Sequence, residues 1–187
     1  HLNAESTVSY QEKGWEESRA VKLEGEAFFE VKWGSSFKVI TANGEVEVLG
    51  TSFNVRSRGD WMQVACKTGK VRVSSSSSDS EQVITPGLAV AIENGRVTKP
   101  VETRLDIIDS WRSGEYYFES LPLQQILNEV KRLYQVEIDH DFSQSELKSP
   151  ITTTFSSLKD AVQTIAVQKG RKHSLNEAET RISFIVD

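Results

Sequence analysis

The chain has few of the features that mark several classes of protein. Its one cysteine, Cys66, excludes an internal disulfide and a cysteine-rich zinc site. No apolar run approaches the roughly 20 residues that a membrane-spanning helix needs, and the first residues lack the basic start of a signal peptide. Lys and Arg number 22 against 27 Asp and Glu, whereas nucleic-acid binding needs a concentrated basic face. We therefore expect a globular protein or a piece cut from a membrane-anchored one.

The sequence also lacks a catalytic motif. It contains no His-Glu-x-x-His, nucleophile elbow or Gly-rich phosphate loop. The run Asp139–Asp141 has no identifiable fourth metal ligand and is interpreted as a solvated loop. Glu24 and Glu26, two residues apart on a strand, are interpreted as part of an exposed polar face. We predict no enzyme activity, no catalytic residue, no metal and no cofactor.

The first half of the chain has the pattern of half-buried strands. Apolar residues alternate with polar ones in five short runs, and glycine-containing turns separate them. The runs are Val21–Leu23, Phe37–Val39, Val46–Val48, Val71–Val73 and Val90–Ile92. The turns are Asn43-Gly44, Thr68-Gly69, Pro86-Gly87 and Asn94-Gly95.

A repeat lies within this half. The pattern Val, four residues, Gly, a charged residue and Val occurs around Gly44, Gly69 and Gly95. The three glycines are 25 and 26 residues apart. A period of about 25 residues is typical of stacked β units that share a core, although hairpin proteins also repeat turn chemistry by chance. We interpret it as stacking.

The second half changes to helical periodicity. Apolar residues fall at helical spacing in 123–134 and again in 158–166, and the two sets match at a constant offset of 35 residues. Ser157 with Asp160 resembles a capping box, and Gly170 is a natural helix end. Five strand-like segments flank the helices: 116–119, 136–139, 151–155, 172–175 and 181–186.

Together these patterns predict a mainly β plus α+β protein of two domains. Residues 1–108 are expected to form a twisted, stacked β domain of solenoid-like or sandwich-like form. Residues 109–187 are expected to form a small βαββαββ two-layer domain with both helices on one face of the sheet.

Several ordered motifs resemble the FecR-like anti-sigma factors. Residues 23–31, LEGEAFFEV, are similar to that family's LxGEAFFEV, and residues 46–55, VEVLGTSFNV, to its VxVLGTxFNV. Residues 2–6, LNAES, are similar to its LNAGS, with Glu5 in place of the usual glycine. The matching signature residues, which we expect to have structural roles, are Gly25, Glu26, Phe29, Gly50, Thr51, Phe53, Gly69, Pro86, Gly87, Trp111 and Gly114.

The resemblance implies a function based on binding. Such proteins are single-pass inner-membrane regulators that hold an extracytoplasmic-function sigma factor through a cytoplasmic segment. Their periplasmic region receives a signal from the N-terminal signalling domain of a TonB-dependent outer-membrane transporter. On this resemblance the chain is a periplasmic fragment, and residues 109–187 are similar to the secretin and TonB short N-terminal type of domain found in the Bacteroidetes branch. No contact with nucleic acid or membrane is expected.

The final segment, 180–187, is a candidate docking strand. It has no Pro or Gly, and at a sheet edge its open backbone groups would accept a strand from the transporter domain. Arg181, Ser183 and Ile185 would then face outward and contact the partner. The alternative is that this strand is central or covered.

Aromatic residues leave another function open. Trp15, Trp33 and Trp61 all lie close to turns, and on one side of the domain they would form a carbohydrate platform. Trp111 and the segment 116–118 lie where the two halves meet, either as a core between the domains or as an exposed anchor for a partner.

Overall fold

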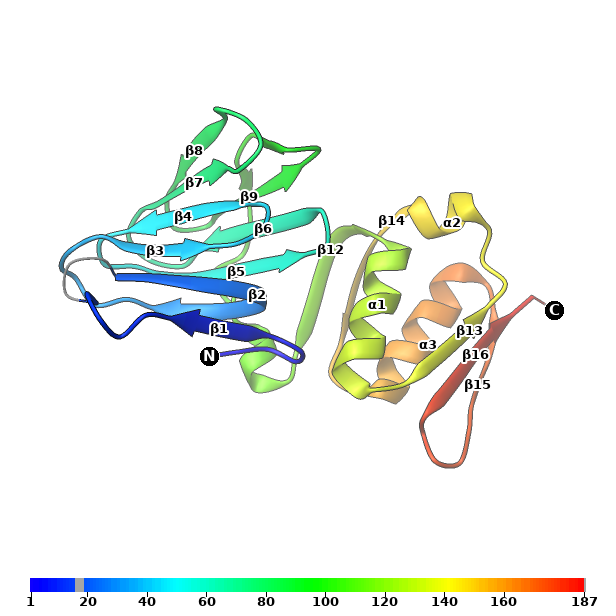
Figure 1. The fold of residues 1–187 in the computed structure, drawn as a ribbon. Helices are drawn as coiled ribbons and strands as arrows, with labels where there is room; N and C mark the ends of the chain where they lie inside the picture. Colours follow the sequence, from blue (N-terminus) through cyan, green and yellow to red (C-terminus); the bar gives the residue numbers. More distant parts are fainter. Residues whose placement is uncertain (16–18, 187) are drawn as a thin grey trace. The chain divides into compact units, whose positions relative to one another are not determined.

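The computed structural model describes residues 1–15 and 19–186, which form two compact units, His1–Asp109 and Ser110–Asp187 (Figure 1). The first unit is built of strands. They are β1 (Thr7–Tyr10), β2 (Arg19–Glu30), β3 (Phe37–Ile40), β4 (Gly44–Val48), β5 (Ser52–Arg58), β6 (Trp61–Cys66), β7 (Val71–Ser75), β8 (Glu81–Ile84), β9 (Leu88–Glu93), β10 (Arg96–Val97) and β11 (Val101–Glu102).

These strands form one large, nearly closed sheet in the order β10-β9-β6-β5-β2-β3-β4-β7-β8, with β1 on β2 and β11 on β9. The sheet folds over a single core, and we call the two parts that enclose this core its two faces. The long strand β2 belongs to both faces: Arg19–Lys22 pair with β3, and Gly25–Glu30 pair with β5. The change of partner falls at Gly25, whose φ of 103° few side chains tolerate. The mainly β character expected of this half is confirmed.

The core of the first unit lies between the two faces. Alternate residues of β3 to β7 point inward, including Val39, Val46, Val55 and Val73, and each is fully buried. Cys66 belongs to the same core, and burial raises the pKa of its thiol to about 11. The lone cysteine therefore serves as a small buried apolar side chain.

The 25-residue repeat does not correspond to one recurring structural unit. Gly44 and Gly95 lie in hairpins, β3–β4 and β9–β10, where a turn joins paired strands. Gly69 lies instead between β6 and β7, which do not pair with each other but with β9 and β4. The repeat therefore marks places where the chain reverses, some within a hairpin and one between two hairpins.

The serine-rich segment 74–80 forms hydrogen bonds between the two faces. Ser75 Oγ and Ser78 Oγ each donate to the Gly95 carbonyl oxygen, at 2.6 and 2.7 Å. The backbone N–H of Val97 donates to Ser80 Oγ at 3.0 Å. These bonds tie the β7–β8 hairpin to the β9–β10 hairpin, so the run contributes to closing the sheet.

The second unit contains helices and short strands. Its elements are η1 (Ser110–Ser113), β12 (Tyr116–Pro122), α1 (Leu123–Tyr134), β13 (Glu137–His140), α2 (Gln144–Lys148), β14 (Pro150–Phe155), α3 (Leu158–Lys169), β15 (Lys172–Leu175) and β16 (Arg181–Ile185). The expected strands and both long helices are present, and α2 is an addition. Within the described residues, no helix combines the length and the apolar character needed to cross a bilayer.

The predicted two-layer arrangement of this unit is wrong. Its strands form two separate sheets, β12-β14 and β13-β16-β15. Helix α1 packs against β12 and β13, and α3 against β14 and β15, so each helix contacts both sheets (Figure 1). Both helices bury a broad apolar side, which explains why they need cover from more than one sheet.

Capping explains where α3 begins and ends. Ser157 Oγ accepts from the Asp160 N–H at 3.2 Å, and an Asp160 carboxylate oxygen accepts from the Ser156 N–H at 3.0 Å. Gly170 closes the helix in the left-handed conformation. The caps expected from Ser157, Asp160 and Gly170 are therefore confirmed, with the carboxylate bonded one residue before the N-cap.

Candidate functional site

The candidate docking strand β16 is central in its sheet. It pairs with β13 in parallel, from Glu137 beside Arg181 to His140 beside Phe184, and with β15 in antiparallel. Both of its edges are occupied, so the prediction that it accepts a partner strand is wrong. The parallel pairing with β13 joins segments more than 40 residues apart, which local sequence does not reveal. Asp187, the last residue of the candidate segment, lies outside the described residues.

The three predicted contact residues nevertheless share one side of this sheet. Ile182 and Phe184 are buried against the helices, and side chains alternate along a strand. Arg181, Ser183 and Ile185 therefore project from the opposite side. Ile185 is 54% exposed, next to Lys172 of β15. We call the side chains of residues 137, 139, 172, 174, 181, 183 and 185 the outer face.

An ion pair organises the polar end of the outer face. The Arg181 Nε atom lies 2.5 Å from an Asp139 carboxylate oxygen. This hydrogen bond lowers the pKa of Asp139 and raises that of Arg181. Both side chains are at least half exposed, so the pair contributes little to stability but fixes a charge pattern. Asp139 is thus part of a strand and an ion pair, and its interpretation as loop was wrong.

A second ionic network secures the end of β16. The Arg171 guanidinium binds Asp141 and Glu146, each at 2.8 Å, and lies over the Phe142 ring, 5.1 Å from its centroid. Asp141 also accepts from the Val186 N–H at 2.6 Å. Sequence reasoning missed Arg171, although its position directly after the helix-ending Gly170 places it where α3 turns back toward the sheet.

Two of the charged groups in this network have lowered pKa values. The Val186 N–H, followed by Arg171, lowers the pKa of the Asp141 carboxyl. The Ser143 backbone and side chain, followed by Arg171, lower that of Glu146. Ser143 and Glu146 also form the capping box of α2. The network therefore ties α2, α3 and the last strand together through charge.

In the first unit, the signature residue Glu26 is a buried structural carboxylate. It is 5% exposed, and its two oxygens accept from the side-chain amides of Asn3 and Asn54, both at 2.8 Å. The interpretation of Glu24 and Glu26 as one exposed face was wrong, because β2 changes partners at Gly25 between them. Glu24 is exposed.

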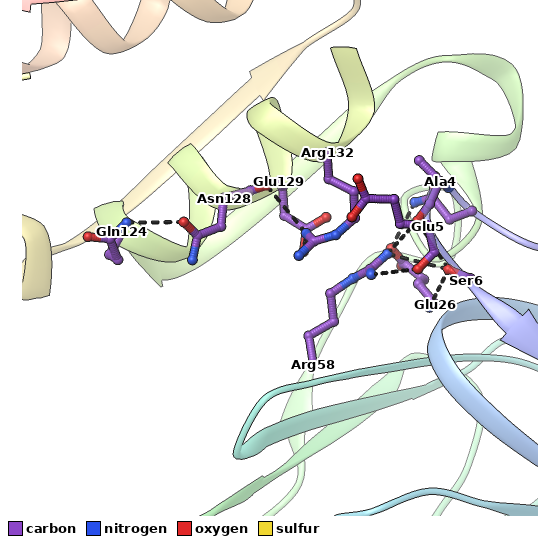
Figure 2. Close-up of polar contacts among 10 residues, drawn as sticks. Ala4, Glu5, Ser6, Glu26, Arg58, Gln124, Asn128, Glu129 and Arg132 are labelled. Atoms are coloured by element: carbon purple, nitrogen blue, oxygen red, sulfur yellow. Dashed lines mark hydrogen bonds and ion pairs between the residues drawn. The ribbon is translucent and has the colours of Figure 1, made fainter. Parts of the chain in front are cut away.

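Arg58 stabilises the N-terminal turn beside Glu26. Its guanidinium donates to the Ala4 carbonyl at 2.8 Å and the Glu5 carbonyl at 3.1 Å, and Ser6 Oγ accepts from the Glu26 N–H at 2.9 Å (Figure 2). Glu5 has a φ of 48°, the left-handed region in which glycine is favoured. The departure from the family's glycine at Glu5 therefore leaves the turn conformation in place. Figure 2 also shows, on helix α1, bonds from Gln124 to Asn128 and from Arg132 to Glu129.

The other signature glycines permit close packing of the connections between the two faces. A Cβ on Gly25 would lie 2.4 Å from Ser6 Oγ. One on Gly50 would lie 2.7 Å from the Trp33 backbone, and one on Gly69 would lie 2.7 Å from the Gly50 carbonyl oxygen. Three connections thus touch with no room for side chains, which fits structural rather than binding roles.

The remaining signature residues lie in packing or turn positions. Phe29 stacks on the fully buried Phe53, with ring centroids 5.3 Å apart. Thr51 Oγ1 donates to the Lys70 carbonyl at 3.1 Å. Three others occupy turns: Pro86 and Gly87 precede β9, and Gly114 follows η1, which holds Trp111.

The tryptophans do not form a carbohydrate platform. Trp33 is 81% exposed and follows β2, at the end of the sheet where Glu30 pairs with Ser52. Trp61 lies at the opposite end of β5, beneath the Arg56 guanidinium. Trp15 packs on Tyr10 and Phe37 instead. Trp33 and Trp61 therefore do not share a side, as the carbohydrate-binding alternative would require.

The aromatic residues of segment 116–118 contribute to the core of the second unit. Tyr116 and Phe118 lie 5.6 and 5.5 Å from the Phe155 ring centroid. Residues 1–15 and 19–186 hold no cluster of three or more His, Cys, Asp or Glu side chains placed to bind a metal ion. The arrangement thus offers surfaces for binding, built on rigid strands.

Comparison with known proteins indicates which class of protein has such surfaces. Residues 1–72 match the family model described as FecR protein. Two crystal structures of a candidate anti-sigma factor from Parabacteroides distasonis ATCC 8503, at 1.65 and 2.50 Å resolution, are similar over the whole chain. Each is 28% identical, with all of this chain and 89% of that one covered and TM-scores of 0.86 and 0.85. No curated protein matches.

The two kinds of match agree with each other. The family model covers the part of the first unit that holds Glu26, Gly50 and Phe53, and the structural match extends through the second unit. FecR anti-sigma factors are regulatory proteins and not enzymes. This chain is thus similar to the FecR family in its N-terminal part and to a candidate anti-sigma factor over its whole length.

Proposed function

We propose that this chain is the periplasmic signal-receiving region of a single-pass inner-membrane anti-sigma factor. It binds the N-terminal signalling domain of a TonB-dependent outer-membrane transporter. A cytoplasmic segment outside this sequence passes the transporter's state to an extracytoplasmic-function sigma factor. The observation that carries the proposal is the match to a candidate anti-sigma factor over all of both units, together with the FecR match at the N-terminus.

The proposal assigns separate roles to the two units. Residues 109–187, which resemble the secretin and TonB short N-terminal type of domain, present the outer face to the transporter. This face combines an exposed apolar residue, Ile185, with a fixed pair of opposite charges, Arg181 and Asp139. Such a mixture suits a transient protein interface, in which a few apolar anchors are surrounded by polar groups.

The test is a binding titration of the 187-residue chain with the N-terminal signalling domains of TonB-dependent transporters from the same genome. We expect one of these domains to bind, and Ile185→Asp to weaken binding about tenfold or more, because a charge would be buried in the interface. Val167→Asp is the matched control, since Val167 is 69% exposed on α3 and lies away from the outer face.

Two results would reject the proposal. If none of the signalling domains binds, the assigned partner is wrong. If one binds and the folded Ile185→Asp chain binds it equally well, the outer face is not the interface. Ser183→Pro is unsuitable as a test variant, because β16 is bonded on both sides and proline would disrupt its sheet.

A further inference from the structure

A groove lined by both polar and apolar residues lies on the first unit. Its volume is about 690 Å³, which is within the size range of small-ligand sites. The floor is formed by β1 and β2, and the sides by the start of the β3–β4 turn and the end of β5. The lining residues are Thr7, Ser9, Lys22, Leu23, Glu24, Ile40, Thr41, Ala42, Asn43, Ser57 and Gly59.

Strand register places four polar side chains together on this floor. Thr7 lies opposite Glu24, and Ser9 lies opposite Lys22. Val21 and Leu23 are buried, so the alternating residues Lys22 and Glu24 point outward. The groove therefore presents one ammonium, one carboxylate and two hydroxyl groups on a single surface.

These four side chains are not used by the fold. Within residues 1–15 and 19–186, no hydrogen bond or ion pair engages the Lys22 ammonium, the Glu24 carboxylate or the Thr7 and Ser9 hydroxyls. Other charged residues of the first unit do find partners, as Lys38 does with Glu45 at 2.6 Å. Among the described residues, these two opposite charges therefore have no protein partner.

One side of the groove is fixed in place. The Asn43 side-chain amide donates to Ser57 Oγ and to the Gly59 carbonyl, both at 2.9 Å. Thr41 Oγ1 donates to the Gly44 carbonyl at 3.0 Å. Because these bonds hold the two turns together, the groove is preorganised, which reduces the entropic cost of binding.

We infer that this groove binds a small zwitterion of dipeptide size, with its carboxylate at Lys22 and its ammonium at Glu24. The Cα atoms of Lys22 and Glu24, two residues apart on β2, are separated by about 7 Å along the strand. Two fully extended residues of a peptide span the same distance. The Thr7 and Ser9 hydroxyls can bond the peptide group between the charges. The balance of one cation and one anion disfavours a simple ion. This site goes beyond the proposed function and adds a small-ligand input to the first unit.

The test is a titration of the ¹⁵N-labelled 187-residue chain with L-alanyl-L-alanine, followed by amide chemical shifts. We expect saturable shifts confined to β1, β2 and the turns at 40–43 and 57–59. The blocked probe, N-acetyl-L-alanyl-L-alanine amide, has the same peptide group without either charge and should bind at least about tenfold more weakly, because both charge-assisted bonds are lost.

Lys22→Gln and Glu24→Gln should each weaken dipeptide binding about tenfold. The matched controls Lys99→Gln and Glu102→Gln, which remove exposed charges elsewhere on the unit, should leave it unchanged. The inference is overturned if no saturable shift appears in the groove, if the blocked probe binds equally well, or if the groove variants bind like the controls. Ile185→Asp should not affect this titration, so failure here is separable from failure of the proposed transporter interface.

Discussion

The two units keep their polar groups in different ways. In His1–Asp109 a carboxylate, Glu26, lies in the interior and is held by two neutral amides. In Ser110–Asp187 charged groups pair with one another instead, as Arg171 does with Asp141 and Glu146 and as Arg132 does with the buried Glu129. The interior carboxylate of the first unit is therefore held by neutral groups, whereas the end of β16 is held by a charged network.

The cores differ in the same sense. The first unit has one continuous core between the faces of a nearly closed sheet, with Phe53 fully buried in it. The second has two small sheets joined by α1 and α3, with Phe155 among Tyr116, Phe118 and Tyr134. The large sheet makes the first unit sensitive to a single cavity, since strands β2 to β9 all contribute to the same core.

The largest predicted effect tests whether each unit depends on its own core. Phe53→Ala should lower the free energy of unfolding of the first unit by about 3–5 kcal/mol, because it removes a buried ring and leaves a cavity. Phe155→Ala should cause a loss of similar size in the second unit. Hydrogen exchange of individual amides, followed by NMR, separates the two responses.

Val101→Ala is the control for this comparison. Val101 is 59% exposed, so its truncation should change stability by less than about 0.5 kcal/mol. Equal loss of protection throughout both units in the Phe53→Ala chain would contradict the view that each core supports mainly its own unit.

Local signals predicted the parts of the fold that local physics determines. The cap formed by Ser157 and Asp160 and the left-handed Gly170 located α3, because capping involves residues only a few positions apart. The Asn94-Gly95 turn was likewise predicted, since both residues adopt positive φ in the β9–β10 hairpin.

The pairing of strands that lie far apart in the chain could not be predicted from the sequence. Nothing near Arg181–Ile185 indicates that β13 occupies one edge of β16, because that bond pattern depends on where α1 and α3 place the strands. Long-range pairing also decides the burial of Glu26. The alternation of side chains along a strand predicted that Glu26 is exposed together with Glu24. Glu26 is buried because β2 changes its pairing partner at Gly25. The candidate contacts Arg181, Ser183 and Ile185 remain a prediction.

A smaller predicted effect concerns backbone conformation in the first unit. Glu5 has a positive φ, which costs a residue with a side chain about 1–2 kcal/mol relative to glycine. Glu5→Gly should therefore be more stable than Glu5→Ala by about 1 kcal/mol. Both variants lose the Glu5 side chain, so the difference between them measures the free-energy cost of the positive φ at residue 5. Chemical denaturation of the two variants measures the difference, and equal stability would show that the turn is not strained.

The smallest predicted effect tests the dependence of the second unit on charge. The pKa of the Asp141 carboxyl is lowered in the folded chain, first by the Val186 N–H and then by Arg171. The folded state thus binds this proton less readily than the unfolded state does. The stabilisation is present above the ordinary carboxyl pKa of about 4 and is lost as the pH falls through the lowered value.

We therefore expect the end of β16 to loosen in acid before the rest of its sheet. The Val186 amide should lose protection from hydrogen exchange as Asp141 becomes protonated, while the amides of β6, in the core of the first unit, keep theirs over the same pH range. Asp141→Asn should remove this pH dependence, because an uncharged amide cannot titrate, and its Val186 amide should exchange faster at neutral pH. A pH dependence that persists in Asp141→Asn would assign the effect to another titrating group and would show that Asp141 does not secure the end of β16.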